Sequence, residues 1–377
     1  VDTTDTHSFS VDTTGTQGEV TNNGDGTFTY SANGAFEHLA EGETATDTFT
    51  YTVTDDSGAA NDSATETATI TITGINDVPT LAEGSIAANE DGGAVNFDLS
   101  SIGDDVDSDD DGSTLKYTIT GQPGEGVASI SGATLTFDPG SEFQDLGQGE
   151  TRNVVIQITA EDAHGATAVN DVTVTVTGAN DAPTLADGLA SASEDGVTVD
   201  VDLAALGADA DSDDDGSTLT YSITGTPSEG SASISGTTLT FDPGSDFQDL
   251  ALGETRDVTI QVTAEDAHGA TAVNPVTVTV TGANDAPTLA AALASADEDG
   301  VTVDVDLATL GADVDSDDDG STLTYSVTGN PSEGSASISG TTLTFDPGAD
   351  FQDLAVGETR DVTIQVTAED AHGATAV

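Results

Sequence analysis

The sequence predicts an all-β chain, built as an elongated array of similar β-sandwich domains. Three observations support this prediction. The segment Gly-Ile-Asn-Asp-Val-Pro-Thr at 74–80 recurs in near-identical form at 178–184 and 282–288, a period of 104 residues. Within each period, short runs of alternating apolar and polar residues predict strands, and no segment has the spacing of an amphipathic helix. Clusters of Gly, Pro, Asn and Asp separate these runs.

The period that begins at residue 184 shows the strand pattern clearly. Roughly seven short strands in about 100 residues are typical of an immunoglobulin-like β-sandwich. The strand-like runs lie at 197–203, 219–223, 231–235, 238–241, 258–262 and 276–280. We expect the core of this domain to contain Leu219, Tyr221, Ile223, Ile234, Leu239, Phe241, Phe247, Leu250, Ile260, Val262, Val278 and Val280.

We therefore expect four domains, of which the last three are copies of one repeat. Residues 1–79 differ from the others, yet Phe36–Thr44 aligns with Phe247–Thr255. This alignment indicates that the first domain lacks its N-terminal part and the fourth its last strand. We expect the natural molecule to continue in both directions with further tandem repeats. The expected domains are 1–79, 80–183, 184–287 and 288–377.

The charge of the chain excludes several classes of partner. Only 4 Lys and Arg residues stand against 70 Asp and Glu residues, and the net charge is -66. Such a chain has no basic surface with which to bind the phosphates of nucleic acid or an anionic membrane. There is no Cys, and no stretch approaches the roughly 18 apolar residues of a membrane span. We expect no nucleic-acid binding and no membrane insertion within this segment.

An acidic loop occurs once in each repeat, at Asp107–Gly112, Asp211–Gly216 and Asp315–Gly320. Its Asp-x-Asp-x-Asp-Gly pattern resembles the start of an EF-hand calcium loop. The EF-hand interpretation fails because Ser222 stands where the bidentate Glu should be, and no helix is expected on either side. A solvated charge cluster is the simplest alternative. Three copies beside the same Asn-Asp linker favour a cation site, and a ligand set of hard oxygens favours Ca²⁺ over Mg²⁺.

Other motifs give only weak indications of catalysis or metal binding. The Asp56-Ser57-Gly58 segment mimics an aspartic-protease motif but occurs only once, whereas that chemistry needs two such Asp residues. His164, His268 and His372 occur once per repeat without a second His or Cys nearby, and we interpret them as turn residues rather than zinc ligands. We expect no enzyme, because no pair of nucleophile and base is recognisable.

Three motifs give the 104-residue units a family resemblance. The Asn-Asp-Ala-Pro-Thr linker, the acidic loop and the segment Ala264–Gly269 resemble the cadherin-like repeats of bacterial surface proteins. Residues 1–74, through 23–30 and 47–53, resemble the repeat of VCBS-type proteins. Arrays of this kind resemble the extender regions of very large calcium-dependent, RTX-type adhesins. That resemblance implies export by type I secretion and display at the bacterial cell surface in biofilms.

The resemblance also implies Ca²⁺ ions between consecutive domains. Their ligands would come from the upstream domain, from the linker and from two acidic loops of the downstream domain. The junction near residue 76 departs from the pattern, because His38 occupies the place that Asp145 has in the next repeat, so this site is expected to be weaker. The implied ligands are Asn76, Asp77, Glu90, Asp107, Asp109, Asp111, Asp145, Asp162, Asn180, Asp181, Glu194, Asp211, Asp213, Asp215, Asp249, Asp266, Asn284, Asp285, Glu298, Asp315, Asp317, Asp319, Asp353 and Asp370.

The expected function is therefore mechanical. Calcium at the linkers would stiffen a spacer that holds a distal adhesive domain away from the cell. One alternative is a subunit of a self-assembling extracellular filament or matrix, in which exposed sheet edges pair. A carbohydrate-binding module is a weaker alternative, because the chain has no Trp and each repeat has one Tyr.

Overall fold

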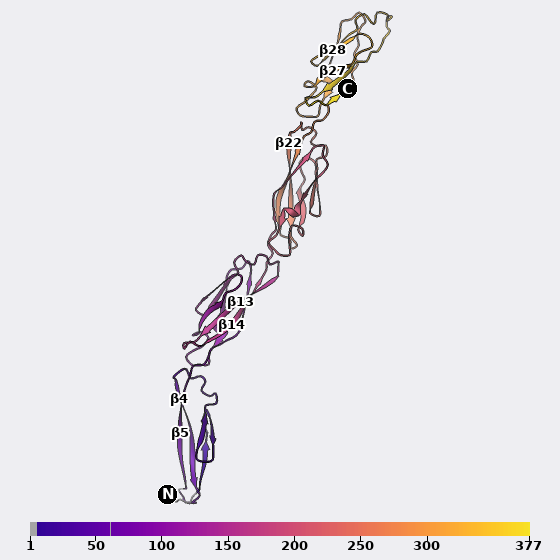
Figure 1. Cartoon of the computed structure of the whole chain (residues 1–377). Coiled ribbons are helices and arrows are strands. Elements are labelled where there is room, and N and C mark those ends of the chain that lie inside the picture. The colour runs from indigo at the N-terminus through magenta and orange to yellow at the C-terminus, as the bar shows by residue number, and fades with distance from the viewer. Residues whose placement is uncertain (1–5, 61) are drawn as a thin grey trace. The chain divides into compact units, whose positions relative to one another are not determined.

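The computed structural model describes residues 6–60 and 62–377, which form strands, turns and three short 3₁₀-helices (Figure 1). Contacts between Cα atoms divide the chain into two units, Val1–Asn180 and Asp181–Val377, each of which is described by itself. Each unit contains two consecutive β-sandwich domains. The predicted all-β class and the immunoglobulin-like, cadherin-like sandwich are confirmed.

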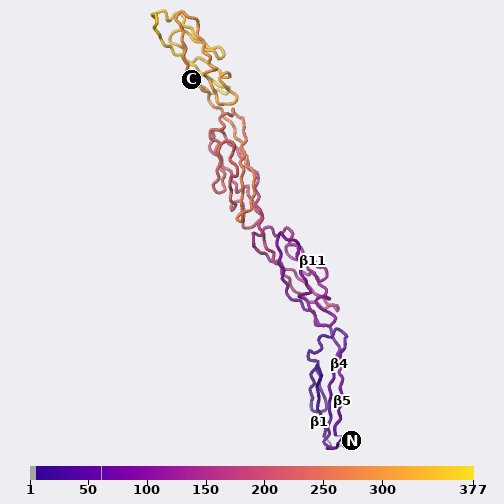
Figure 2. Tube along the Cα trace, turned by 180° about the vertical axis from the view of Figure 1, so that it is seen from behind, coloured from indigo at the N-terminus to yellow at the C-terminus, as the bar shows by residue number. Residues whose placement is uncertain are grey.

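The N-terminal domain of the first unit has a three-stranded sheet in the order β1-β4-β5 and a hairpin of β2 and β3. In Figure 2 the strands β1, β4 and β5 lie side by side. The rings of Phe28 and Phe49 pack between the two layers with centroids 5.7 Å apart. The strands are β1 (His7–Asp12), β2 (Glu19–Asn22), β3 (Phe28–Ser31), β4 (Thr44–Asp55) and β5 (Ser63–Thr73).

The second domain of this unit is a complete sandwich. One sheet has the order β10-β13-β14-β7, with β7 parallel to β14, and the other has the order β11-β12-β8. A two-residue ladder joins β6 to β9. The elements are β6 (Thr80–Leu81), β7 (Gly84–Asn89), β8 (Val95–Asp98), η1 (Leu99–Ser101), β9 (Gly103–Asp104), β10 (Lys116–Gly121), β11 (Val127–Ser131), β12 (Thr134–Asp138), β13 (Thr151–Glu161) and β14 (Thr167–Thr177).

The first domain of the second unit repeats this topology. Its sheets have the orders β16-β23-β22-β19 and β17-β21-β20, and β15 pairs with β18. Along β22, side chains alternate between solvent and core, as a half-buried strand requires. The elements are β15 (Thr184–Leu185), β16 (Gly188–Ser193), β17 (Val199–Asp202), η2 (Leu203–Ala205), β18 (Gly207–Ala208), β19 (Thr220–Gly225), β20 (Ser231–Ser235), β21 (Thr238–Asp242), β22 (Thr255–Glu265) and β23 (Thr271–Thr281).

The last domain repeats the strands of the third, except that β30 and β31 are shorter than β22 and β23 and that no strand in the described residues corresponds to β16. Its sheets are β27-β30-β31, β25-β29-β28 and β24-β26. Because β31 offers a ladder of only two residue pairs, β30 is shorter than its counterpart β22. The elements are β24 (Thr288–Leu289), β25 (Val303–Asp306), η3 (Leu307–Thr309), β26 (Gly311–Ala312), β27 (Thr324–Gly329), β28 (Ser335–Ser339), β29 (Thr342–Asp346), β30 (Gln365–Glu369) and β31 (Thr375–Ala376).

The core predicted for the third domain is confirmed. Of its twelve members, all are buried except Ile223 and Ile234, which are partly buried against the same cluster. The run at 197–203 is a strand only from Val199, because Val197 is exposed and Leu203 begins η2. Among residues 6–60 and 62–377 there is no helix with the length and apolarity that a membrane crossing requires.

Candidate metal centres at the domain junctions

Three carboxylates converge at the junction between the two domains of the second unit. Glu194 follows β16, Asp285 lies in the linker, and Asp315 lies in the acidic loop that follows β26. Each offers one oxygen, and these oxygens lie within 4.8 Å of one another. Glu194 is 2% exposed and Asp315 is 3% exposed. The upstream domain, the linker and the downstream domain therefore each supply an acidic ligand to one buried point.

The backbone fixes one oxygen of Glu194 and one oxygen of Asp315. The Ala283 amide donates to Glu194 Oε1 at 2.6 Å, and the Asp285 amide donates to Asp315 Oδ2 at 3.0 Å. The other oxygens, Glu194 Oε2, Asp315 Oδ1 and Asp285 Oδ2, are buried and accept no hydrogen bond from the described residues. Buried polar atoms nearly always have a partner, so these oxygens indicate an absent ligand.

Two neighbouring residues, one in the linker and one in the acidic loop, also carry an oxygen without a donor. Asn284 Oδ1 and Asp313 Oδ2 are buried without a hydrogen-bond donor in the described part of the chain. Asn284 is oriented by its amide group, whose Nδ2 donates to Asp370 Oδ2 at 3.0 Å and to the Asp285 carbonyl at 2.8 Å. Asp313 Oδ1 accepts from the Asp315 amide at 3.2 Å. We call the five residues that carry these oxygens the junction cluster: Glu194, Asn284, Asp285, Asp313 and Asp315.

Burial raises the pKa of Asp315, and the charges of Asp313 and Asp285 raise it further. Burial likewise raises the pKa of Glu194 and of Asp285. Without a cation these groups therefore resist ionisation. A divalent cation would relieve both the burial and the repulsion. The residues fit Ca²⁺, which takes six to eight oxygen ligands in flexible geometry.

Asp370, after β30, acts on the cluster through Asn284. Its Oδ1 accepts from the amides of His372 and Ala374 at 2.8 and 2.9 Å, and its Oδ2 accepts from Asn284 Nδ2. Burial alone would raise the pKa of Asp370, but these donors outweigh it and lower the pKa. Asp370 therefore stays ionised and orients Asn284.

The junction inside the first unit repeats this arrangement in part. The Asp77 amide donates to Asp107 Oδ2 at 2.8 Å, and Asn76 Nδ2 donates to Asp162 Oδ2 at 3.0 Å. Asn76 Oδ1, Asp107 Oδ1 and Asp105 Oδ2 are buried without a donor among the described residues. Burial raises the pKa of Asp105.

A serine in each acidic loop contacts the upstream domain. In the second unit the Ser316 amide donates to the Asp249 carbonyl at 3.0 Å, and its hydroxyl donates to Glu254 Oε2 at 2.7 Å. In the first unit the Ser108 hydroxyl donates to Glu43 Oε2 at 2.7 Å. Sequence reasoning missed both glutamates. The sequence signal that could have identified them is the Gly-Glu-Thr segment, which occurs once in each domain.

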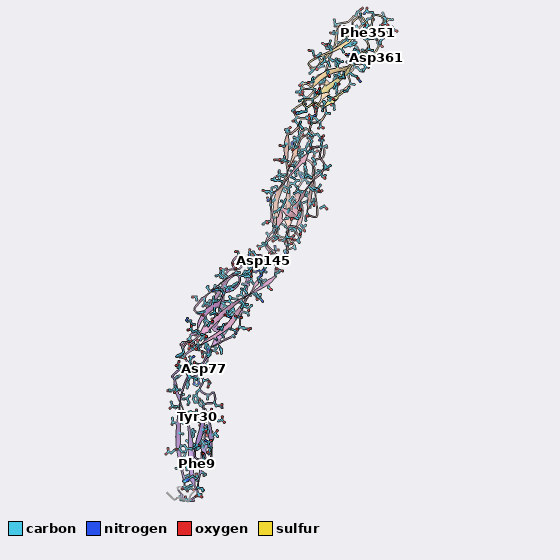
Figure 3. All side chains as sticks on the ribbon, viewed as in Figure 1. Phe9, Tyr30, Asp77, Asp145, Phe351 and Asp361 are labelled. Atoms are coloured by element: carbon cyan, nitrogen blue, oxygen red, sulfur yellow. The ribbon has the colours of Figure 1, made fainter. Side chains whose placement is uncertain are left out.

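The expectation for Asp145, Asp249 and Asp353 requires a correction, because each carboxylate pairs with an arginine seven residues later. Arg256 Nη2 lies 2.8 Å from Asp249 Oδ2, and the hydrogen bond from Arg256 lowers the pKa of Asp249. Asp145 and Asp353 form the same pair with their own arginines. In Figure 3, Asp145 and Asp77 lie at opposite ends of the second domain. At the junction the main-chain carbonyl of Asp249, and not its side chain, accepts from the next domain, through the Ser316 amide.

The later acidic residues of each loop do not reach the junction cluster. Asp319 is exposed, and its Oδ1 accepts from the amide and hydroxyl of Ser321 and from the Thr322 amide. These bonds lower the pKa of Asp319 and close the turn. Asp111 and Asp215 form the same turn in their repeats. The aspartate at the third position of each loop lies beside a histidine and not among the junction carboxylates: Asp109, Asp213 and Asp317.

The remaining expected ligands repeat these local contacts within each unit. In the first unit the Ala179 amide donates to Glu90 Oε1 at 2.5 Å, and Asn180 is the last residue of that unit. In the second unit the Asp181 amide donates to Asp211 Oδ2 at 3.0 Å. Asp266 accepts from the amides of the turn that follows β22, as Asp370 does after β30. Glu298 is half-buried before β25, and its carbonyl accepts from Gln352 Nε2 at 3.3 Å.

The glycine that ends each acidic loop is required for packing. A Cβ on Gly320 would lie 2.1 Å from the Ala308 carbonyl oxygen, closer than any side chain allows. The Gly320 carbonyl also accepts from the buried Tyr325 hydroxyl at 2.7 Å. This contact replaces the EF-hand explanation, in which the glycine makes a turn around the ion.

Comparison with known proteins agrees with this fold. Residues 76–177, 180–281 and 284–377 match the family model of the bacterial Ig domain, and residues 1–74 match that of a bacterial cadherin-like domain. The structure of protocadherin gamma B2 extracellular cadherin domains 1–5 is similar, with a TM-score of 0.57, 15% identity, and coverage of 98% of this chain and 70% of that one. Protocadherin gamma B7 domains 1–4 are similar with a TM-score of 0.58, 17% identity, and coverage of 99% and 90%. No curated protein matches the chain.

Proposed function

The chain belongs to the bacterial Ig domain family, and on that premise we propose that it is an extender region of a secreted bacterial surface adhesin, stiffened by Ca²⁺ at its linkers. Cadherin-like and Ig-like repeats are structural rather than enzymatic, and cadherin-like domains are generally extracellular. The finer proposal is that the chain is exported by type I secretion and serves adhesion in biofilms, where each repeat adds length between the cell and a distal binding domain.

The observation that carries the proposal is the junction cluster. Five buried oxygens from two domains and their linker lack hydrogen-bond donors among the described residues, and three of them belong to carboxylates with raised pKa values. An ion held by Glu194, Asp285 and Asp315 would bind both domains at once. The linker could then no longer bend without breaking metal–oxygen bonds. The same sequence pattern recurs around Asn76, so the proposal extends to the linker inside the first unit.

Calcium would also act as a folding switch. The cytosol holds little free Ca²⁺, whereas the extracellular concentration is millimolar. A ligand at about 100 times its dissociation constant adds roughly 2.7 kcal/mol per site. That gain is large beside the roughly 5–15 kcal/mol by which a domain is stable. The chain would thus be less stably folded until it leaves the cell.

Chelation tests the proposal. Removing Ca²⁺ from the full chain should lower its melting temperature by several degrees, and small-angle scattering should show a more flexible chain. Adding Mg²⁺ in place of Ca²⁺ should restore little, because Mg²⁺ demands octahedral geometry and keeps its water. Identical melting curves with and without calcium would contradict the proposal.

The carbohydrate-binding alternative loses support. Tyr117, Tyr221 and Tyr325 are each 5–6% exposed, and each hydroxyl donates to a glycine carbonyl inside its own domain. A sugar ring needs an exposed aromatic face. These tyrosines offer none.

A further inference from the structure

The loop at 249–254 of the third domain is bonded to the first residue of the linker that follows this domain. The Gly282 amide donates to the Glu254 carbonyl at 2.8 Å, and the Gly253 amide donates to the Gly282 carbonyl at 3.0 Å. A Cβ on Gly282 would lie 2.3 Å from the Ala251 carbonyl oxygen, so only glycine allows this close approach. The start of the linker is therefore attached to this loop without any ion.

The same loop also holds the acidic loop of the fourth domain. The Ser316 amide donates to the Asp249 carbonyl at 3.0 Å, and the Ser316 hydroxyl donates to Glu254 Oε2 at 2.7 Å. Glu254 Oε2 accepts in addition from the Ala251 amide at 3.2 Å, which orients it from within its own domain. We call Asp249, Glu254 and Ser316 the clasp. None of these hydrogen bonds uses an atom of the junction cluster, so they do not require a bound ion.

The junction inside the first unit has the same contacts, although its upstream domain matches a different family model. The Ser108 amide donates to the His38 carbonyl at 3.0 Å, and the Ser108 hydroxyl donates to Glu43 Oε2 at 2.7 Å. The Gly74 amide donates to the Glu43 carbonyl at 2.8 Å. The hydrogen bonds from the Ser108 hydroxyl and the Ala40 amide lower the pKa of Glu43. Because the bond to His38 uses its main chain, the contact tolerates a change of side chain at this position.

The fourth domain shows that the glutamate of the clasp is oriented by its own loop. Glu358 Oε2 accepts from the Ala355 amide at 2.8 Å, although no serine donates to Glu358 in the described residues. Glu254 makes the same bond to the amide three residues before it. A side chain that is already oriented loses little conformational freedom when its partner binds. The upstream domain therefore presents a preformed acceptor to the serine of the next domain.

On the basis of the proposed calcium-stiffened linker, we propose that the clasp holds the two domains of a junction in the calcium-binding orientation before the ion binds. Glu254 and Ser316 are then positioning residues for the calcium site. The junction cluster takes its ligands from both domains, so its apparent dissociation constant is the intrinsic value divided by the fraction of molecules in which these ligands are assembled. The clasp increases that fraction, and the ion-free junction is a partly ordered joint.

The test measures the relative orientation of the third and fourth domains with and without calcium. The chain has no Cys, so Thr259→Cys in β22 and Ser326→Cys in β27 place one spin label on an exposed position of each domain. In chelator, Ser316→Ala should broaden the distribution of distances between the labels. In calcium the distributions with Ser316 and with Ser316→Ala should agree, because the ion then fixes the domains. Ser316→Thr keeps the hydroxyl and should restore the narrow distribution.

Calcium titration of the unlabelled chain by calorimetry gives the second readout. Ser316→Ala and Glu254→Ala should each weaken calcium binding at this junction by roughly 2- to 10-fold, the range that one net hydrogen bond supplies. The double variant should lose little more than either single variant, because the two residues form one contact. Ser321→Ala is the matched control. The Ser321 hydroxyl donates to Asp319 Oδ1 within the same loop and does not cross the junction, so its loss should change neither readout.

The clasp and the calcium-stiffened linker fail on different results. Label distances in chelator and a calcium affinity that are both unchanged in Ser316→Ala would overturn the clasp. Equal broadening in Ser321→Ala would overturn it as well, because the effect would then come from the loop and not from the contact between domains. A wild-type chain that binds no calcium would instead refute the calcium-stiffened linker.

Discussion

Asp315 and Asp319 lie four residues apart in one acidic loop, yet the structure gives them different roles. Asp315 is buried in the junction cluster, and one of its oxygens has no donor among the described residues. We expect Asp315→Asn to weaken calcium binding at this junction by roughly 10-fold or more, because a buried charged ligand is replaced by a neutral one. Calcium titration by calorimetry measures the change.

Asp319→Asn is the matched control for that experiment. Asp319 is exposed and closes its turn through Ser321 and Thr322, and asparagine can accept the same hydrogen bonds. Calcium affinity should remain within about twofold, and the stability of the domain should change little. If the two variants lost calcium equally, the loop would bind the ion as a whole, and the division of roles would be wrong.

The single tyrosine of each repeat has a structural role that can be tested. Tyr221 is buried, and its hydroxyl donates to the Gly216 carbonyl at 2.7 Å. Tyr221→Phe leaves that carbonyl unpaired in the core, so we expect the domain to lose roughly 1–3 kcal/mol of its free energy of unfolding. Urea denaturation with calcium present measures it. Tyr51→Phe, whose ring packs on Phe28, should change far less, and equal losses would contradict this role.

The residue scale is where prediction from sequence was least complete. The linker pair Asn284 and Asp285 and the loop residue Asp315 were all named from sequence. Asp313 was missed because the acidic loop was taken to begin two residues too late, although the Asp-x-Asp spacing extends back to it. Arg256 was expected to neutralise a nearby carboxylate, and it does. That its partner is Asp249 was missed, because an ion pair across seven residues leaves no periodic pattern.

At the scale of elements, the alternation of apolar and polar residues predicted strands well where one face of the strand is fully buried. The long strand β22 contains its predicted run at 258–262, where Val, Ile and Thr alternate with other residues. The parallel strand β16 was not predicted. Its sequence, Gly188–Ser193, is rich in Ala and Ser and carries no strong apolar stripe. Pairing with β23 makes it a strand, and pairing is a tertiary property that local propensity does not contain.

Calcium should stabilise the junction around the linker to an extent that depends on pH. Burial raises the folded-state pKa of Glu194 above 4.5 and those of Asp285 and Asp315 above 3.8. For raised pKa values, the stability contribution is fully present below the ordinary pKa and is lost as pH rises through the folded value. The ion-free junction should therefore weaken from acidic to neutral pH, while calcium, which needs ionised carboxylates, should bind more tightly over the same range.

Melting curves with calcium and with chelator from about pH 4 to about pH 7 measure this dependence. The difference in melting temperature between the two conditions should be small at the acidic end and should grow toward neutral pH. In Asp315→Asn the growth should be smaller. A difference that stays constant across the range would mean that calcium does not bind these carboxylates.

At the scale of the whole molecule, the 104-residue period was the strongest signal in the sequence. It predicted a tandem array before any strand was assigned, and the family matches begin at the Asn-Asp linkers that define the period. The N-terminal domain was harder to recognise. It aligns with the repeats only over short segments such as Phe36–Thr44. Its match is to a bacterial cadherin-like domain, whereas the resemblance seen in its sequence was to a VCBS-type repeat.

The net charge of -66 leads to a prediction that separates global repulsion from local binding. Even two or three Ca²⁺ ions at each of three linkers would add only roughly +12 to +18, so the calcium-bound chain remains strongly anionic. Monovalent salt screens long-range repulsion, with a Debye length of about 3 Å at 1 M, but it does not replace buried ligands. In chelator, added NaCl should therefore make the chain more compact without making it stiffer. Calcium at low ionic strength should instead lengthen and stiffen the chain. If the scattering profiles in NaCl with chelator and in calcium were the same, the stiffness would come from charge screening and not from bound ions.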